Sequence, residues 1–233
     1  MCLLMKGISR HDIFAGTDRY SHCSYTVCVV CHVSDLKLFY FVFLVCIQVF
    51  PFRKMGKAPV DLSFKCIGSI ADVLHKEPNE GLRPLKRNAD NKFCSQALRL
   101  NNNLISDLAG FTLTIDSLLS DPSHLAWLDL SFNHISRIDK ALTELHELRV
   151  LYLHGNHICK LSEVDKLGVL PFLHTLTLHG NAVENEKTYR DHVISVLPHL
   201  KSMDFSAVTK QERIMSQIWH KKITLSKTKR SPN

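Results

Sequence analysis

The chain has 233 residues, of which 45% are hydrophobic and 22% are charged, so it is long enough to bury a sizeable core. The formal charge of +7 is unevenly spread. Residues 93–208 carry nine Lys or Arg and thirteen Asp or Glu, a net charge of −4, whereas residues 1–57 and 209–233 carry +4 and +6. The acidic middle argues against a phosphate-binding surface there, and we expect no DNA partner.

Residues 1–54 are assigned as a hydrophobic, cysteine-rich extension outside the main fold. Residues 38–50 are apolar except for Gln48, yet they are shorter than the roughly 20 residues that span a membrane. No small-residue cleavage site of a signal peptide follows them. Three interpretations stay open: a membrane anchor, an element packed on the rest of the chain, or an alternative or mispredicted start with Met55 as the natural beginning. We favour the third and expect membrane contact only if residues 38–50 form an anchor.

Five of the eight cysteines lie in the first 46 residues. Cys28-Val-Val-Cys31-His32 matches the attachment pattern of c-type haem, and Cys23 could join the same cysteines and a histidine at a zinc ion. The haem pattern has only three fixed letters and the zinc set lacks a regularly spaced second pair, so we expect no cofactor and no metal. The isolated Cys66, Cys94 and Cys159 suit free thiols in a reducing compartment.

Residues 55–93 are predicted to be an N-terminal flank and cap. Asp61-Leu-Ser-Phe64 favours a capping strand and residues 70–75 a short helix. The run Gly81-Leu-Arg-Pro-Leu-Lys-Arg87 then leads through the polar residues 88–91 into the next region.

Residues 94–208 contain an internal repeat. Four segments align without gaps: Ser95-Gln-Ala-Leu-Arg-Leu-Asn-Asn-Asn103, Leu125-Ala-Trp-Leu-Asp-Leu-Ser-Phe-Asn133, Leu148-Arg-Val-Leu-Tyr-Leu-His-Gly-Asn156 and Leu173-His-Thr-Leu-Thr-Leu-His-Gly-Asn181. A degenerate copy, Leu200-Lys-Ser-Met-Asp-Phe-Ser206, follows. Apolar residues at every second position predict short strands with one face inward. The longest repeat holds an insertion, for which we predict a helical turn at residues 115–120.

The pattern L-x-x-L-x-L-x-x-N resembles the leucine-rich-repeat family. The resemblance implies an α/β solenoid with short parallel strands on its concave face. It also implies that the turn asparagines bond the backbone of adjacent coils, a role carried to Asn103, Asn133, Asn156 and Asn181. The run at 81–87 and the repeats together, over about residues 58–220, are similar to cytoplasmic members of this family with no established catalytic activity.

A helix at residues 186–197 and a last inward strand with Leu200, Met203 and Phe205 are predicted to cap the solenoid. This stretch resembles the C-terminal cap of Sds22-like and U2A′-like repeat proteins, which implies a cytoplasmic location. Thr209-Lys-Gln-Glu212 fits a capping box that opens a helix over residues 209–222. We expect Ile214, Ile218 and Trp219 to dock on the last coil; the alternative is an exposed helix that carries a partner site. Residues 223–233 are predicted to be a disordered basic tail, either solvated or in contact with RNA or tubulin.

Side chains between and just after the core leucines are expected to face the concave sheet in columns. Trp127 and Tyr152 are predicted contact residues because aromatics are enriched at binding hot spots, and Arg99 is expected to pair with Asp129. Phe132 either joins this surface or packs into its turn, and the two repeat histidines either bind a metal or merely reflect the repetition. The predicted partner-binding residues are Arg99, Asn101, Trp127, Asp129, Tyr152, His154, Thr177 and His179.

The predicted function is therefore a non-catalytic intracellular adaptor that binds a protein through its concave sheet. The alternative is a structural subunit of an axonemal or ribonucleoprotein assembly. An enzyme is disfavoured because the sequence has no G-x-G-x-x-G, G-x-x-x-x-G-K-[ST], H-E-x-x-H or G-x-S-x-G motif.

Overall fold

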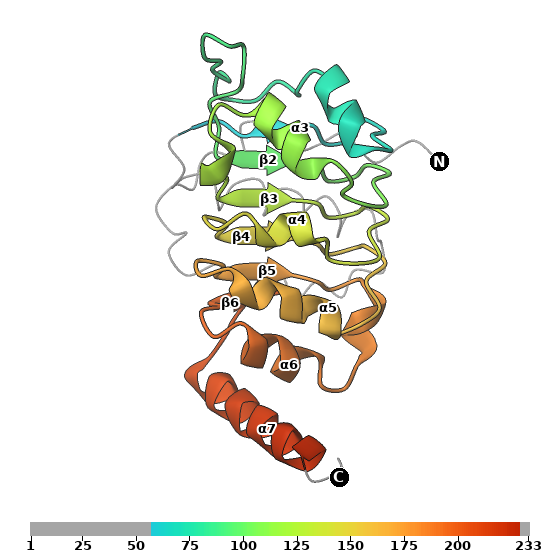
Figure 1. Ribbon diagram of the computed structural model, residues 1–233, viewed down its shortest axis with the longest axis vertical. Helices are drawn as coiled ribbons and strands as arrows, with labels where there is room; N and C mark the ends of the chain where they lie inside the picture. Colours follow the sequence, from blue (N-terminus) through green and yellow to red (C-terminus); the bar gives the residue numbers. More distant parts are fainter. Residues whose placement is uncertain (1–56, 229–233) are drawn as a thin grey trace, which may run out of the picture. The chain divides into compact units, whose positions relative to one another are not determined.

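A computed structural model of the chain describes residues 57–228. These residues form a solenoid whose seven strands lie side by side in chain order, as Figure 1 shows. The pairs from β1 to β6 are parallel, and β6 and β7 are antiparallel. The strands are β1 (Val60–Asp61), β2 (Ala97–Arg99), β3 (Trp127–Asp129), β4 (Val150–Tyr152), β5 (Thr175–Thr177), β6 (Ser202–Met203) and β7 (Ser206–Ala207).

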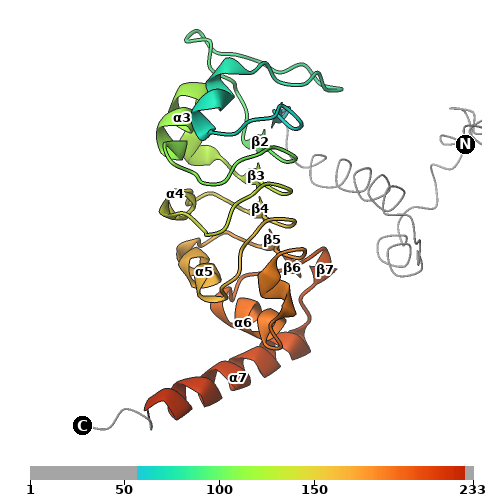
Figure 2. The same cartoon turned by 90° about the vertical axis from the view of Figure 1, so that its right-hand side faces the viewer.

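Short helices return the chain along the opposite side, so that strands and helices form two layers with the core between them (Figure 2). This arrangement confirms the predicted α/β leucine-rich-repeat solenoid. The α-helices are α3 (Phe111–Leu118), α4 (Lys140–Thr143), α5 (Ser162–Asp165), α6 (Tyr189–Val196) and α7 (Lys210–Thr228). The 3-10 helices are η2 (Ile70–His75), η3 (Pro122–His124), η4 (Lys166–Val169) and η5 (Ala182–Asn185).

The repeated leucines form continuous ladders through the core. Parallel pairing places Leu98, Leu128, Leu151 and Leu176 directly beside one another on successive strands. All four are fully buried, as is the second set, Leu100, Leu130, Leu153 and Leu178. Burying a leucine side chain stabilises a fold by about 1.5–3 kcal/mol. Each coil adds its own buried leucines to the core, so each coil adds to the stability of the solenoid.

Each turn asparagine joins its own coil to the preceding one. The Asn133 side-chain amide donates to the carbonyl oxygens of Leu100 (2.9 Å) and Leu130 (3.1 Å), and its oxygen accepts from the backbone N–H of Ile105 (3.0 Å). The buried Asn103, Asn156 and Asn181 make the same set of bonds in their own coils. The four predicted structural asparagines thus satisfy backbone groups that burial would otherwise leave without partners.

The N-terminal cap is itself a partial repeat. Val60 and Leu62 are buried, and Phe64 has a φ of 59°, close to the 53° of Phe132 in the corresponding turn. Lys65 stands where the later coils have their turn asparagine, and its backbone N–H donates to Asn103 of the next coil (2.9 Å). The predicted short helix at 70–75 is present as η2, but the strand β1 is Val60–Asp61 and shares only Asp61 with the predicted strand at 61–64, where Ser63 and Phe64 form a turn.

The inserted helix begins earlier than predicted. The expected turn at 115–120 overlaps the end of α3, which starts at Phe111 and ends at Leu118. Phe111, Ile115 and Leu118 are buried at helical spacing, and the apolar stripe therefore extends one turn further back than the sequence interpretation assumed.

At the C-terminal cap, Leu200 and Met203 are buried as expected, but the prediction for Phe205 was wrong. Asp204 and Phe205 both have positive φ angles, 49° and 59°, and they form the two-residue turn between β6 and β7. This reversal takes the half-buried Phe205 out of the inward row and places its ring on the strand side.

The prediction that Ile214, Ile218 and Trp219 dock was wrong for the two isoleucines and right for Trp219. Ile214 and Ile218 are more than half exposed, whereas Ser216 is fully buried and the half-buried Trp219 packs edge-on against His192 of α6. The polar side chains set this rotation, because Arg190 of α6 binds Glu212 at 2.6 Å.

The helix also continues to Thr228, beyond the predicted end at residue 222. Residues 223–228 of the predicted tail belong to this helix. The predictions for residues 1–54, including the 38–50 segment and the Cys28–His32 motif, lie outside the described residues, as does the end of the tail. Between residues 57 and 228, no helix is both long and apolar enough to cross a membrane.

Replacing one turn asparagine should lower the stability of the fold. Asn156→Ala leaves the carbonyl oxygens of Leu130 and Leu153 and the N–H of Ile135 without their side-chain partner. We expect the free energy of unfolding to fall by about 3 kcal/mol or more, at about 1–3 kcal/mol for each unsatisfied buried group. Urea denaturation measures the loss. The exposed Asn185→Ala is the control and should change the free energy of unfolding by less than about 0.5 kcal/mol. Equal effects of the two substitutions would contradict the proposed role of the turn asparagines.

Candidate functional site

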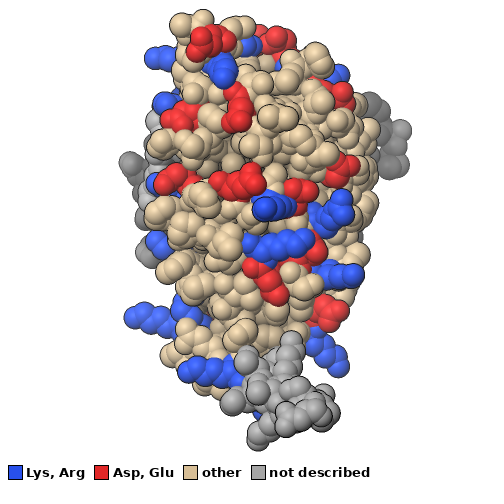
Figure 3. All heavy atoms as spheres, viewed as in Figure 1, with Lys and Arg blue, Asp and Glu red and all other residues tan. Residues whose placement is uncertain are grey.

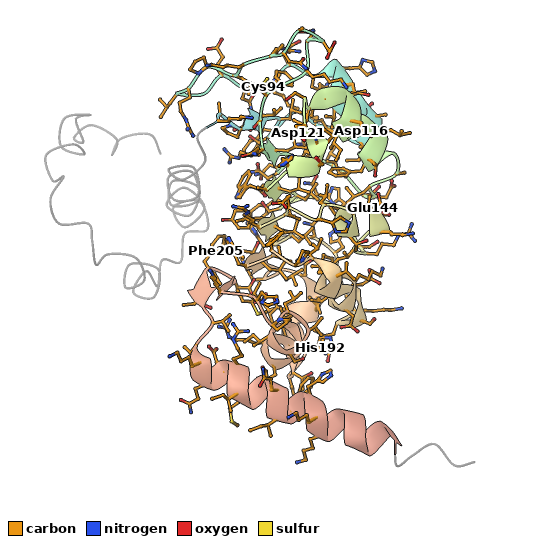
Figure 4. All side chains as sticks on the ribbon, turned by 60° about the vertical axis from the view of Figure 1, so that its left-hand side comes forward. Cys94, Asp116, Asp121, Glu144, His192 and Phe205 are labelled. Carbon is orange, nitrogen blue, oxygen red and sulfur yellow. The ribbon has the colours of Figure 1, made fainter. Side chains whose placement is uncertain are left out.

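The candidate site is the concave surface formed by the outward side chains of the strands. Register aligns Ala97, Trp127, Val150 and Thr175 in one column and Arg99, Asp129, Tyr152 and Thr177 in the next. Figure 4 shows Phe205 on this strand side, with Glu144 on the opposite, helical side. The predicted columns are therefore present.

Five rings gather on this surface, and we call them the concave aromatic cluster: Trp127, Tyr152, His154, His179 and Phe205. Trp127 meets Tyr152 edge to face, with ring centroids 5.5 Å apart. His154 and His179 stack at 4.6 Å with their planes 10° apart, and Phe205 lies 5.5 Å from Tyr152 and 5.6 Å from His179. Such edge and offset contacts are the favoured geometries of aromatic pairs.

Polar partners hold the two histidines in place. Nδ1 of His154 lies 2.7 Å from Oγ1 of Thr177, and Nδ1 of His179 lies 3.2 Å from Oδ1 of Asp204. Asp204 also accepts hydrogen bonds from the backbone N–H of Leu178 (2.7 Å) and from the hydroxyl of Tyr189 (2.8 Å). The carboxylate that orients His179 therefore also ties the last coil to α6.

Burial and these bonds shift three pKa values. Burial, together with the neighbouring His179, lowers the pKa of His154 to about 3, and burial raises the pKa of Tyr152 to about 12. Burial alone would raise the pKa of Asp204, but hydrogen bonds from His179, Leu178 and Tyr189 outweigh it and hold this pKa below its usual range. At neutral pH the cluster thus contains a neutral His154 beside an ionised Asp204.

The expected pairing of Arg99 with Asp129 was wrong. Arg99 binds Asp61 of β1 instead, with Nη1 2.9 Å from Oδ2. Oδ1 of Asp129 accepts from the backbone N–H of Ser131 (3.0 Å) and from its hydroxyl (2.5 Å). Asp61 makes the same two bonds to Ser63 through its Oδ1, and its Oδ2 binds Arg99.

Most of the predicted contact residues are buried on the concave side. Of the eight, His179 is half-buried and the other seven are buried; the exposed fraction of Trp127 is 1% and that of Tyr152 is 5%. Val150, Thr175, Ser202 and Phe205 on the same surface are half-buried. The more accessible side chains therefore lie on β4 to β7.

Phe132 packs over its turn and also borders the concave aromatic cluster at His154. Its ring lies edge-on to His154 at 5.0 Å and covers Gly155, where an added Cβ would come within 2.6 Å of the phenyl carbons. Gly155 also has a φ of 65°. A side chain at position 155 would therefore be strained and would displace Phe132.

Sequence reasoning missed three participants: Asp61, Asp204 and Phe205. A signal for Asp61 was available, because Asp61-Leu-Ser-Phe64 repeats Asp129-Leu-Ser-Phe132 letter for letter. Nothing in the degenerate last copy distinguished Phe205 from an inward-facing residue, since it occupies the position of Leu178.

The site offers aromatic edges and hydrogen-bonding groups. The His179–Asp204 pair could orient a base, but the carboxylate is already used by two backbone N–H groups and Tyr189. Within residues 57–228, no group of three His, Cys, Asp or Glu side chains is placed to hold a metal ion.

Comparison with known proteins adds to this description. The family described as leucine-rich repeat matches residues 95–229. Leucine-rich repeat-containing protein 51 of Macaca mulatta is 51% identical over 161 residues, which cover 69% of this chain and 84% of that protein. The Homo sapiens protein of the same name is 50% identical over equal shares. The crystal structure of the Drosophila melanogaster SNF/U2A′ complex is similar with a TM-score of 0.47 and 21% identity, over 63% of this chain and 94% of that one.

The buried His154 predicts a dependence of stability on pH. The folded chain keeps His154 neutral down to about pH 3, whereas an unfolded histidine binds its proton near pH 6.5. The unfolded state therefore binds more protons between these values, and lowering the pH should destabilise the fold by up to about 1.4 kcal/mol per pH unit. Urea unfolding between pH 7 and 4.5 measures the slope. His154→Gln should flatten it, while the exposed His157→Gln should leave it unchanged; an unaltered slope in H154Q would contradict the assignment.

Proposed function

The chain belongs to the leucine-rich-repeat family, and from this premise we propose that it is a non-catalytic module that binds a protein partner through its concave sheet. Proteins of this family typically serve in protein–protein interaction, and their curved sheets present extended binding surfaces. The observation that carries the proposal is the concave aromatic cluster, because aromatic residues are enriched at the centres of protein interfaces.

Burial divides the predicted contact residues into two roles. His179 and the neighbouring Val150, Thr175 and Phe205 are accessible enough to touch a partner directly. The buried residues form the floor beneath them and fix the positions of the rings. This group comprises Arg99, Asn101, Trp127, Asp129, Tyr152, His154 and Thr177.

The charge and polarity of this surface favour a partner that presents apolar side chains. Arg99 is paired with Asp61, so these two groups add little net charge to the sheet. The adjacent rings offer edges against which an inserted apolar side chain can pack. We propose a partner element with one or two such side chains, seated over β4 to β6.

We further propose that the protein acts in the cytoplasm as an adaptor. Cys66, Cys94 and Cys159 are free thiols, which suits a reducing compartment. The C-terminal cap supports the same location, because Arg190 bonds Glu212, Ser206 and the carbonyl oxygen of Ala207 and so closes the solenoid without a disulfide among the described residues.

The test changes the accessible part of the concave surface while sparing its floor. Val150→Arg with Thr175→Arg places two long cations on β4 and β5, and we expect this to lower partner affinity by at least about tenfold, or about 1.4 kcal/mol. Tagged full-length chain is used to purify partners from cells, with quantitative mass spectrometry of the wild-type and variant samples. Binding of the recovered partner to purified chain then gives the affinity.

A matched control carries the same charge on the helical side. Val169→Arg with Leu113→Arg changes two exposed apolar residues, and partner recovery should stay at the wild-type level. Both double variants should melt within a few degrees of the wild type, because all four positions are at least partly exposed. Equal recovery of the partner by the concave variant and the wild type would rule out this surface.

A further inference from the structure

Helix α7 presents large apolar side chains to solvent. Ile214 is 58% exposed, and Met215 and Ile218 are each 56% exposed. Ile214 and Ile218 are four residues apart and therefore lie on the same face of the helix, with Met215 beside them. We call these three residues the α7 apolar seam.

The rotation of α7 is fixed by polar contacts, so the seam is a stable outward face. Arg213 donates to the carbonyl oxygen of Leu200 at 2.6 Å and also to that of Pro198. Ser216 is fully buried, and Glu212 forms an ion pair with Arg190. The bond from Arg190 lowers the pKa of Glu212 to about 2, so this pair persists across the physiological range.

The surroundings of the seam are basic. Lys210, Lys221 and Lys222 are exposed on the same helix. Glu212 is the single carboxylate in the α7 sequence, and Arg190 neutralises it. In Figure 3, Lys and Arg side chains project around the C-terminal end of the solenoid, whereas both signs are interspersed over the middle of the helical face. A partner for the seam must therefore combine an apolar floor with acidic surroundings.

Two kinds of surface have that chemistry, and the dimensions of the seam favour one. Membrane-surface helices bind in proportion to the apolar area they insert, and they bury a broad apolar face. The seam has three side chains within about 6 Å of helix axis, with lysines near both ends. Narrow apolar rows at i and i+4 are instead typical of helices that lie in a protein groove.

We propose that the α7 apolar seam docks in the calcium-opened groove of an EF-hand sensor protein. Calcium opens such proteins to expose a methionine-rich apolar groove, and their calcium loops are rich in carboxylates. Basic amphipathic helices are the usual targets of these grooves. The docking uses a surface on α7 and is independent of the proposed concave site.

Calmodulin serves as the probe for this chemistry. Isothermal titration calorimetry of the full-length chain should give saturable binding to calcium-loaded calmodulin, with a dissociation constant on the order of micromolar or below. Chelation of calcium with EGTA should abolish it. Ile214→Ser with Ile218→Ser should weaken binding by at least about tenfold, whereas Ile214→Leu with Ile218→Leu should retain it.

Two control variants test whether calmodulin binding depends on the seam rather than on other exposed apolar side chains or on the concave site. Leu113→Ser with Val169→Ser removes two other exposed apolar side chains, and Val150→Arg with Thr175→Arg alters the concave sheet; both should bind calmodulin as the wild type does. Circular dichroism and melting temperature check that every variant is folded.

Two outcomes would overturn the proposal. The first is absence of saturable binding to calcium-loaded calmodulin. If the chain then sediments with vesicles that contain about one third phosphatidylserine, and does so only with an intact seam, the seam is a membrane-surface element. The second is binding that survives EGTA or the serine substitutions, which would show that the lysines alone bind calmodulin.

Discussion

The buried turn asparagine is the interaction on which the solenoid depends. Its amide spans two coils at once, donating to carbonyl oxygens of both and accepting an N–H from the earlier one, as Asn156 does with Leu130, Leu153 and Ile135. Three backbone groups at each turn would otherwise be buried without partners, because the strands are too short to continue the ladder around the bend. An amide is suited to this place since it both donates and accepts. Hydrophobic burial supplies most of the stabilisation, but the asparagine fixes how one coil is set against the next.

The fixed position of each coil relative to the next also determines how side chains are arranged on the concave surface. When coils repeat in register, a side chain at one position lies beside its equivalents, and a stack such as His154 on His179 follows directly from the repetition of His-Gly-Asn. The end coils depart from the rule in different ways. The first coil has Lys65 in place of the turn asparagine, and the backbone N–H of Lys65 donates to Asn103 of the next coil. In the last coil, Asp204 accepts the backbone N–H groups of Leu178 and His179. The turn between β6 and β7 also places Phe205 in the concave aromatic cluster. The residue has a positive φ there, which costs a non-glycine residue about 1–3 kcal/mol.

The parts of the structure that the sequence predicted are those set by the repeat period. Spacing placed the core leucines, the asparagines and the concave columns, because each depends on position within one coil. The failures concern features set by contacts between unlike elements. Arg99 has a carboxylate on each neighbouring strand, Asp61 on β1 and Asp129 on β3, and it binds Asp61; the repeat period alone does not distinguish the two. The rotation of α7 follows from the Arg190–Glu212 pair and the backbone bonds of Arg213, so the apolar pattern alone was wrong for the two isoleucines. Exposure of the concave residues also could not be read from alternation, since both faces of a strand can be buried.

The reversal at Asp204 and Phe205 has a consequence for assembly. A parallel coil leaves its outer strand with unpaired N–H and C=O groups, which could template the first strand of another molecule and build an open-ended filament. Here the final strand runs backward for only two residues, and the chain then passes into α7, which lies against α6. An incoming strand would find the wrong polarity and too short an edge to continue the stack. The same turn that brings Phe205 to the sheet thus also disfavours strand addition, and hence polymerisation, at this end of the solenoid.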